Sequence, residues 1–320
     1  MTKLNNFLYS SQENIKEEKH LSFFSYMNEE IERLSHTGQI GTALNYKAAM
    51  NSFIQFVKTE DLPWASLTEQ IIKEYELWLQ NKYLSKNTIS FYMRQLRSIY
   101  NKAVKANLVK QLSPFSNVYT GIDKTKKRAV DASVITQLIN LDLSHSSSLN
   151  FTKDLFLFSF YMRGMAFVDI AYLKHENIKN GVIRYIRHKT NITMEVKIEQ
   201  CISDIINRYT LKSQLGYVLP IITKNDPEKA YKQYKNKRSY YNKLLKKISQ
   251  LLGTDITLTS YVSRHSWATI ARDMNISLPI ISAGMGHSSE SMTRIYLTSL
   301  EASTIDQANS AILSYIQPAQ

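Results

Sequence analysis

A break in helical patterning between residues 113 and 128 constrains the fold of this chain more than any other feature. Pro114 and Gly121 interrupt the pattern, as is typical of connections rather than helix interiors. A basic cluster follows, formed by Lys124, Lys126, Lys127 and Arg128. At 320 residues the chain is long enough for two domains, each with its own core. We therefore expect two domains joined by a basic linker over residues 113–128.

Ahead of this linker the sequence is patterned as helix. Residues 1–20 are polar and are expected to form a flexible N-terminus, and a helical domain is predicted for residues 21–112. Amphipathic segments recur within that domain at residues 21–34, 41–60, 68–83 and 85–108. Ser85 is placed to cap the last of them. The basic residues on this last helix form either a solvated face or a set of phosphate contacts; they include Lys86, Arg94 and Arg97.

Beyond the linker, residues 129–320 combine helices with a small β-hairpin. An unbroken apolar run at residues 155–162 predicts a buried helix that ends at Arg163 and Gly164. A hairpin is predicted over residues 180–198, which open with an Asn-Gly turn signal and then alternate in polarity. The alternating apolar residues are Ile192, Met194, Val196 and Ile198. The predicted fold class is mainly α with a small β-hairpin or sheet.

Two basic residues beside these elements have structural as well as functional explanations. Arg163 follows an apolar helix, where a charge without a partner would be costly, and Asp169 could be that partner. Lys189 lies at the expected tip of the hairpin, where a lysine is usually solvated. The pattern of residues alone leaves both explanations open.

Residues 259–300 contain three groups that can act on a phosphate. Arg264 carries a permanent positive charge in a planar fork of donors, which suits two phosphate oxygens. His287 sits between a glycine and two serines, where a tight turn can expose its ring, and Tyr296 follows nine residues later. Each of these residue types is more often structural or solvated than catalytic when it occurs singly. Their order and spacing carry the functional argument.

The local pattern around these groups predicts two short helices. Ser260 is expected to cap the first helix, and Tyr261 and Arg264, three residues apart at its start, are expected to project the same way. The apolar face of this helix is predicted to hold Trp267, Ile270, Ala271 and Met274. Ser277 with Pro279 is expected to open the second helix, which ends at glycines just before His287.

This segment resembles the catalytic end of the tyrosine recombinases, the phage integrase family. The family pattern is His-x-x-Arg-His, then a Gly-His pair and then a tyrosine, which Arg264, His287 and Tyr296 match. Tyr261 departs from the pattern, because it stands where the family usually has its first histidine. The resemblance covers most of the chain from about Lys127 onward and is looser before that residue.

The resemblance implies a helical, SAM-like core-binding domain followed by a tyrosine-recombinase catalytic domain. It also implies a role for each matched residue. Tyr296 would be the nucleophile that forms a 3′-phosphotyrosyl intermediate, and Arg163 and Arg264 would hold the phosphate. Lys189 would be the general acid, His287 would assist at a phosphate oxygen, and Tyr261 would donate a neutral hydrogen bond. The segment after Tyr296 would dock on a neighbouring protomer.

Charge and resemblance together favour double-stranded DNA as the partner. The formal net charge of +13 favours a polyanion, although charge alone does not separate nucleic acid from a membrane surface. The expected DNA-binding residues are Lys86, Arg94, Arg97, Lys126, Lys127, Arg128 and Arg187. The family joins two DNA sites by four protomers, which predicts a tetramer on paired sites. About 20 residues precede the first predicted helix, so we expect a simple-site recombinase without an arm-binding domain.

No cofactor or metal is expected, because arginine and lysine supply the positive charge that the reaction needs. The single cysteine, Cys201, excludes an internal disulfide framework and a cysteine-based metal cluster. No apolar run approaches the roughly 18 residues of a membrane-spanning helix, and the N-terminus lacks the core of a signal peptide. A cytoplasmic protein without a membrane partner is therefore expected.

Two alternatives remain at this stage. A type IB topoisomerase shares the chemistry but relaxes supercoils without exchanging strands between sites. A catalytically inactive DNA-binding regulator could keep the same fold; the complete arginine, lysine, histidine and tyrosine set argues against it, and only Tyr261 argues for it. The outcome of recombination, whether integration, excision or inversion, is left open.

Overall fold

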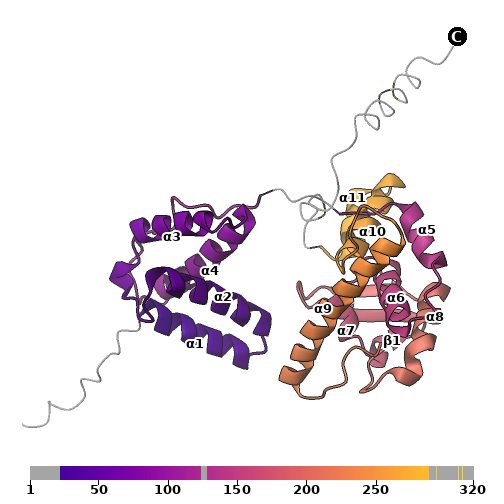
Figure 1. Cartoon of the computed structure of the whole chain (residues 1–320). Coiled ribbons are helices and arrows are strands. Elements are labelled where there is room, and N and C mark those ends of the chain that lie inside the picture. The colour runs from indigo at the N-terminus through magenta and orange to yellow at the C-terminus, as the bar shows by residue number, and fades with distance from the viewer. Residues whose placement is uncertain (1–21, 124–127, 288–292, 294–308, 310–311, 313–320) are drawn as a thin grey trace, which may run out of the picture. The chain divides into compact units, whose positions relative to one another are not determined.

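The computed structural model describes residues 22–123, 128–287, 293, 309 and 312. The chain divides into two compact units, Met1–Thr125 and Lys126–Gln320 (Figure 1). The expected flexible N-terminus at residues 1–20 lies outside the described residues, as do Lys126, Lys127 and Tyr296.

The first unit is a set of helices whose positions follow the amphipathic pattern. It contains α1 (Phe23–His36), α2 (Ile40–Val57), α3 (Glu69–Asn81) and α4 (Lys86–Lys105), with a short 3₁₀ turn, η1 (Trp64–Ser66). The predicted segments are confirmed with small shifts at their ends. Ser85 caps α4 as expected, because its side chain accepts a hydrogen bond from the Thr88 amide.

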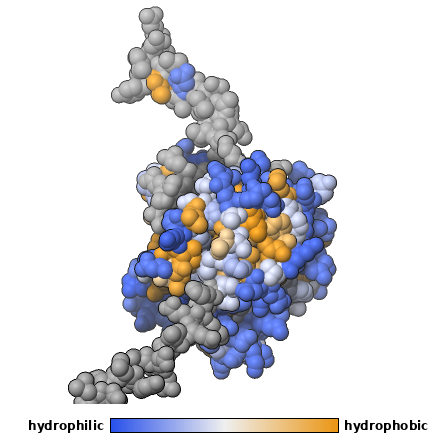
Figure 2. Space-filling view, turned by 90° about the vertical axis from the view of Figure 1, so that its left-hand side faces the viewer, coloured by the Kyte–Doolittle hydropathy of each residue, from blue (hydrophilic) through white to orange (hydrophobic). Residues whose placement is uncertain are grey.

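Aromatic side chains fill the core of this unit. Phe23, Phe53 and Tyr75 are fully buried, and the rings of Phe53 and Tyr75 lie 4.8 Å apart. Partly buried rings such as Trp64 and Trp78 pack against this centre. Figure 2 is turned so that the left-hand side of Figure 1 faces the viewer. It shows apolar residues at the surface, bordered by hydrophilic ones. The rings contribute large apolar areas to the core that holds these helices together.

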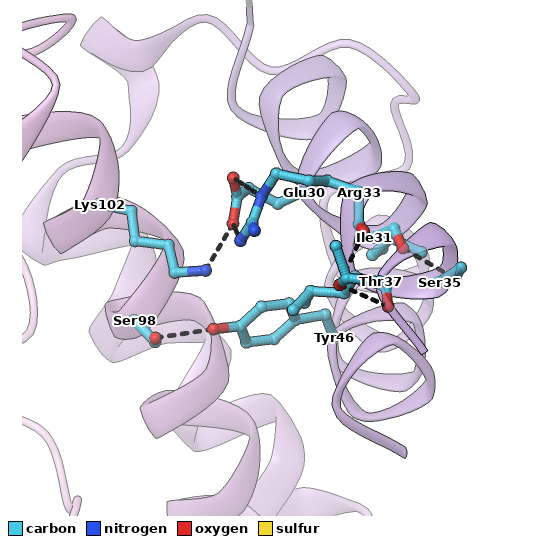
Figure 3. A network of polar contacts seen from close by, with 9 residues as sticks. Glu30, Ile31, Arg33, Ser35, Thr37, Tyr46, Ser98 and Lys102 are labelled. Carbon is cyan, nitrogen blue, oxygen red and sulfur yellow. Dashed lines mark hydrogen bonds and ion pairs between the residues drawn. The ribbon is translucent and has the colours of Figure 1, made fainter. Parts of the chain in front are cut away.

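A polar network fastens α1 to α4 beside that core (Figure 3). The Glu30 carboxylate on α1 accepts hydrogen bonds from Arg33, at 2.9 and 3.0 Å, and from Lys102 on α4. Tyr46 on α2 hydrogen-bonds Ser98 on α4 at 2.9 Å. The hydrogen bonds from Arg33 and then from Lys102 lower the pKa of Glu30 to about 2. Glu30 therefore stays ionised well into acid.

The second unit surrounds a three-stranded antiparallel sheet with helices. Its strands are β1 (Ile178–Lys179), β2 (Val182–Ile186) and β3 (Thr193–Lys197), in the order β1-β2-β3. Its helices are α5 (Ala132–Asn140), α6 (Ser147–Tyr161), α7 (Phe167–Ala171), α8 (Gln200–Tyr209), α9 (Pro227–Leu251), α10 (Val262–Asp273) and α11 (Leu278–Met285), with 3₁₀ turns η2 (His175–Asn177) and η3 (Thr210–Lys212). The mainly helical fold class with a small sheet is confirmed.

The hairpin and the buried helix are confirmed as well. Tyr185 on β2 faces Met194 on β3 in the register, and both are buried. The helix α6 buries most of its apolar run and is joined to α8 through Asp154, which accepts hydrogen bonds from Arg208 at 2.6 Å and Tyr209 at 2.7 Å. Among the described residues, no helix is long and apolar enough to cross a membrane.

The start and end of α10 differ from the expectation. Tyr261, not Ser260, is the N-cap residue, and no side chain caps the helix. Asn242 on α9 holds the Ser260 amide at 2.9 Å, which keeps that residue outside the helix. Met274, expected on the apolar face, is exposed because α10 ends at Asp273 and Met274 is its C-cap residue.

The Glu30 network predicts an acid-dependent stability. Because folding lowers the Glu30 pKa, its contribution is complete above pH 4.5 and is lost as the pH falls toward 2. Glu30→Gln should lower the free energy of unfolding at neutral pH by about 1–2 kcal/mol and abolish this acid-dependent difference. Urea unfolding followed by tryptophan fluorescence measures it. Glu29→Gln, at the exposed neighbour, should behave like the parent; equal behaviour of both variants would contradict the assignment.

Candidate active site

Arg264 joins three separate segments of the second unit. It lies in the first turn of α10 and is 3% exposed. Its Nη1 donates to the Gly164 carbonyl at 2.8 Å, and its Nη2 donates to the Met285 carbonyl at 2.7 Å. The same Nη2 lies 2.9 Å from Nε2 of His287. Arg264 and His287, which were each expected to act on the phosphate, therefore lie side by side.

The turn that follows α6 fits closely against Arg264. Arg163 and Gly164 both have a positive φ, of 58° and 73°. A Cβ on Gly164 would lie 2.6 Å from the Arg264 Cα, so only glycine allows this approach. Arg163 is half-buried, and its Cδ lies 3.8 Å from the place a Cβ would take on Gly284 in α11.

Two buried hydroxyls position α10 against α6. The Ser159 hydroxyl donates to the Met165 carbonyl at 2.7 Å and lies 2.7 Å from the Ser263 hydroxyl. Since the one Ser159 proton is used on the carbonyl, Ser263 is the donor in the second bond. This pair places the residue next to Arg264 directly against the end of α6.

His287 follows the left-handed Gly286 that ends α11, as the two glycines led us to expect. Its Nε2 must accept from Arg264, because a guanidinium only donates. Its Nδ1 therefore carries the proton and donates to the Thr293 hydroxyl at 2.7 Å. Burial, and then the charges of Arg264, Arg187 and Lys189, lower the pKa of His287 to about 4. The ring is neutral at neutral pH.

The turn between β2 and β3 is held by a buried carboxylate. Asp169 accepts hydrogen bonds from the backbone amide and ring Nδ1 of His188, both at 2.9 Å. The expected partner of Arg163 is thus bound to His188 instead, and the Asp169–Arg163 explanation is wrong. Lys189, the next residue, is exposed in this turn. Its charge contributes to the lowered pKa of His287, so Lys189 lies within electrostatic range of that ring.

Arg187 is not placed as an exposed DNA contact. It is 6% exposed, and its Nη1 donates to the carbonyls of Met285, at 3.0 Å, and Gly286. From the sequence, this arginine was expected among the DNA-binding residues. It lies inward because β2 ends at Ile186 and the next side chain points toward the end of α11.

The other expected site residues fall into three groups. Tyr261 is 45% exposed, with its ring 5.2 Å from that of His265. Lys86 and Arg128 are exposed, whereas Arg94 and Arg97 are half-buried. Arg94 donates to the Ser90 carbonyl at 3.3 Å, and Arg97 donates to the Thr120 hydroxyl at 3.1 Å. Lys126, Lys127 and Tyr296 lie outside the described residues.

The helix α9 carries a basic surface. Its tyrosines at 234 and 241 are buried against the core, while its lysines lie on the exposed side. A hollow of about 520 Å³ runs along this side; it is lined by Lys224, Lys229, Lys232, Gln233, Asn236, Lys237 and Tyr240. Such a lysine-lined surface suits a polyanion.

Two family models cover most of the chain. Residues 22–118 match the phage integrase SAM-like domain, and residues 128–303, over half of the chain, match the phage integrase family. The chain is a tyrosine recombinase of the phage integrase family. The second match contains Arg264, His287 and Tyr296. No curated protein matches the sequence.

Solved integrases share the fold of this recombinase. The Tn1549 transposon integrase in complex with transposon right end DNA is 16% identical, with a TM-score of 0.65 over 92% of this chain and 99% of that chain. A lambda integrase dimer bound to a COC′ core site is 13% identical, with a TM-score of 0.63 over 87% and 98%. A lambda integrase tetramer bound to a Holliday junction is 13% identical, with a TM-score of 0.61 over 88% and 78%.

Several groups of the recombinase site were not found from the sequence. Thr293 accepts the Nδ1 proton of the His287 ring, and Asp169 holds the turn of Lys189. The signal for Gly164 was present, because a glycine directly after a charged helix end often marks a close backbone approach. Thr293 and Asp169 had no comparable signal, since their partners are separated from them by turns or by intervening elements.

The close approach at Gly164 predicts a large cost for any side chain there. Gly164→Ala should lower the free energy of unfolding by about 3 kcal/mol, since the Cβ would overlap Arg264 as well as strain the backbone. Gly181→Ala is the matched control, because Gly181 has the same φ of 73° with nothing within 4 Å of its Cβ position. It should cost only about 1 kcal/mol, from backbone strain. Equal losses in urea unfolding would show that the Arg264 contact is unimportant.

The environment of His287 predicts a low titration midpoint. NMR of the imidazole ring should give a midpoint at about pH 4 in the folded protein, and near 6.5 in urea. Because the folded pKa is the lower of the two, the unfolded chain binds the proton first. His287 therefore makes the folded state less stable as the pH falls from 6.5 toward 4. A folded midpoint at the ordinary histidine value would contradict the buried, cation-flanked placement.

Proposed function

We propose that this recombinase cleaves and rejoins double-stranded DNA at specific sites through a 3′-phosphotyrosyl intermediate on Tyr296. The observation that carries the proposal is the Arg264–His287 pair, in which a buried guanidinium lies 2.9 Å from a neutral imidazole. The fixed cation suits a phosphate that gains negative charge during attack, and the neutral acceptor suits a nucleophile that must lose its proton. Membership of the family supports Tyr296, at the matched position, as the nucleophile.

The chemistry needs three kinds of group. A phosphodiester repels nucleophiles, so Arg163 and Arg264 neutralise its oxygens as charge builds in the transition state. The leaving 5′ oxygen needs a proton, which Lys189 donates. A phenol both attacks and leaves well, so the Tyr296 phosphodiester preserves the bond energy for rejoining. No nucleotide or metal is needed when fixed cations supply the charge.

His287 then has a specific part in this scheme. Its Nε2 lone pair is used on Arg264 in the free protein. When the phosphate draws the Arg264 guanidinium, the lone pair becomes available to the Tyr296 hydroxyl. The low pKa of His287, about 4, keeps that lone pair free of a proton at neutral pH. Tyr261 donates a hydrogen bond to a phosphate oxygen in place of the family histidine.

The proposed DNA partner and assembly are taken from the solved integrases. The Tn1549 and lambda integrases are seen bound to DNA, and the lambda integrase as a tetramer on a Holliday junction. We extend both features to this chain: duplex DNA bound by its basic surfaces, and four protomers on paired sites in the cytoplasm. A type IB topoisomerase would relax supercoils without exchanging strands, and a regulator would bind without cleaving.

The nucleophile is tested by covalent capture. A library of nicked duplexes of random sequence is incubated with the protein in EDTA, and the DNA that remains attached after denaturation is sequenced. The parent should form an adduct at a defined sequence, since its cations replace a metal. Tyr296→Phe should bind this duplex but form no adduct, whereas Tyr315→Phe, in the same C-terminal segment, should be unaffected. An adduct in Tyr296→Phe would place the nucleophile elsewhere; strand joining between two sites excludes the topoisomerase.

Tyr261 is tested on the captured duplex. Removing one transition-state donor costs on the order of 3 kcal/mol, so Tyr261→Phe should cleave roughly a hundredfold more slowly with unchanged binding. Tyr261→His should retain activity, because histidine restores a donor. A Phe variant as fast as the parent would show that Tyr261 only packs on His265.

A further inference from the structure

Arg187 and Arg264 meet at one backbone carbonyl. Arg187 follows strand β2, and its Nη1 donates to the Met285 carbonyl at 3.0 Å and to the Gly286 carbonyl. Arg264, from α10, donates to the same Met285 carbonyl at 2.7 Å. Met285 and Gly286 are the two residues directly before His287. Two guanidinium groups therefore flank the histidine from different elements.

The Arg187 guanidinium has donors to spare although it is buried. It is 6% exposed, comparable to the 3% of Arg264. Within the described part of the chain, its Nε and Nη2 donate to no residue and it forms no ion pair. The buried carboxylate of this region, Asp169, is taken by His188. The Nε and Nη2 atoms are not among the buried polar atoms that lack a partner, so these unused donors reach solvent and can bind an anion.

The charges around His287 also favour an anion at this place. Burial and then Arg264, Arg187 and Lys189 depress the His287 pKa, so these three cations converge on the ring. Arg163 reaches the region from the α6 end, near Gly284, whereas the cations that lower the His287 pKa are Arg264, Arg187 and Lys189. The paired guanidinium groups closest to the histidine in these contacts are thus those of Arg264 and Arg187.

We propose that Arg187 is a catalytic residue that donates from Nε or Nη2 to the scissile phosphate, beside Arg264. This inference rests on the proposed recombinase function and adds a phosphate ligand that the sequence motif does not contain. Each of two buried guanidinium groups can bind one non-bridging oxygen, and both gain as negative charge develops there. Arg187 transfers no proton; it neutralises charge. Its Nη1 meanwhile holds the turn that carries His287.

A neutral phosphate analogue distinguishes neutralisation of the phosphate by Arg187 from support of the His287 turn. The captured duplex is made with a methylphosphonate at the scissile position, where a methyl group replaces one non-bridging oxygen and removes its charge. Each diastereomer removes one of the two oxygens. An arginine whose task is to neutralise the missing oxygen becomes dispensable on that diastereomer, whereas an arginine that only holds the protein does not.

We expect Arg187→Ala to form the covalent adduct about a hundredfold more slowly than the parent on the phosphodiester. On one methylphosphonate diastereomer the two proteins should agree within about threefold, because the arginine has no charge to neutralise. Arg264→Ala should show the same kind of rescue. Arg184→Ala is the matched control: this arginine lies on β2, three residues before Arg187, is paired with Glu195 and has a 70% exposed side chain. It should match the parent on both substrates.

The Arg187→Lys variant separates a catalytic defect from a loss of folding. A lysine amine can still donate to the Met285 and Gly286 carbonyls, so this variant should keep the parent's unfolding midpoint. It should still cleave the phosphodiester more slowly and recover on the same diastereomer, since one amine cannot serve both the carbonyls and the phosphate.

Two results would overturn the proposal. One is a defect of equal size on the phosphodiester and on both diastereomers, which would make Arg187 only a support for the His287 turn. The other is cleavage at the parental rate in both Arg187 variants. Failure of the recombinase function is seen separately, as an adduct that survives in Tyr296→Phe or as no adduct with the parent on any duplex.

Discussion

The site depends on the hydrogen bonds of one buried guanidinium. Arg264 ties the turn after α6, through Gly164, to the end of α11, through Met285, and reaches His287 beyond it. A guanidinium can do this because its donors lie in a rigid plane and keep their charge. Three segments far apart in the chain are thereby brought to one point. The contacts of Gly164 and His287 would be lost without this arginine.

This arrangement concentrates positive charge where a phosphate would bind. Arg264, Arg187 and Lys189 all act on His287 and help to keep its ring neutral. The charge is unfavourable in the free protein, and binding of an anion would relieve it. The fold meets this cost with well-packed elements around the site, including the buried Ser159–Ser263 pair and the carboxylate of Asp169, which holds the turn of Lys189.

The two units are held together by different interactions. The α1–α4 unit is held by an aromatic core and by the ionised Glu30 between α1 and α4. Its amphipathic helices bury their apolar faces in that core. The second unit must hold side chains at hydrogen-bond distance in a charged recess. It does so with turns in left-handed conformation at Arg163, Gly164 and Gly286, where helices end abruptly against other elements.

The sequence by itself determined the helices, the hairpin and the matched residues Arg264 and His287, because periodicity, caps and motif spacing are local properties. It could not decide which partner each charged residue takes. Asp169 bound His188 rather than Arg163, and Arg187 turned inward to carbonyls of residues 285 and 286. Those contacts join residues separated by 19 and 98 positions. Only the packing of the tertiary structure sets such distances, and with them the burial that shifts the His287 pKa.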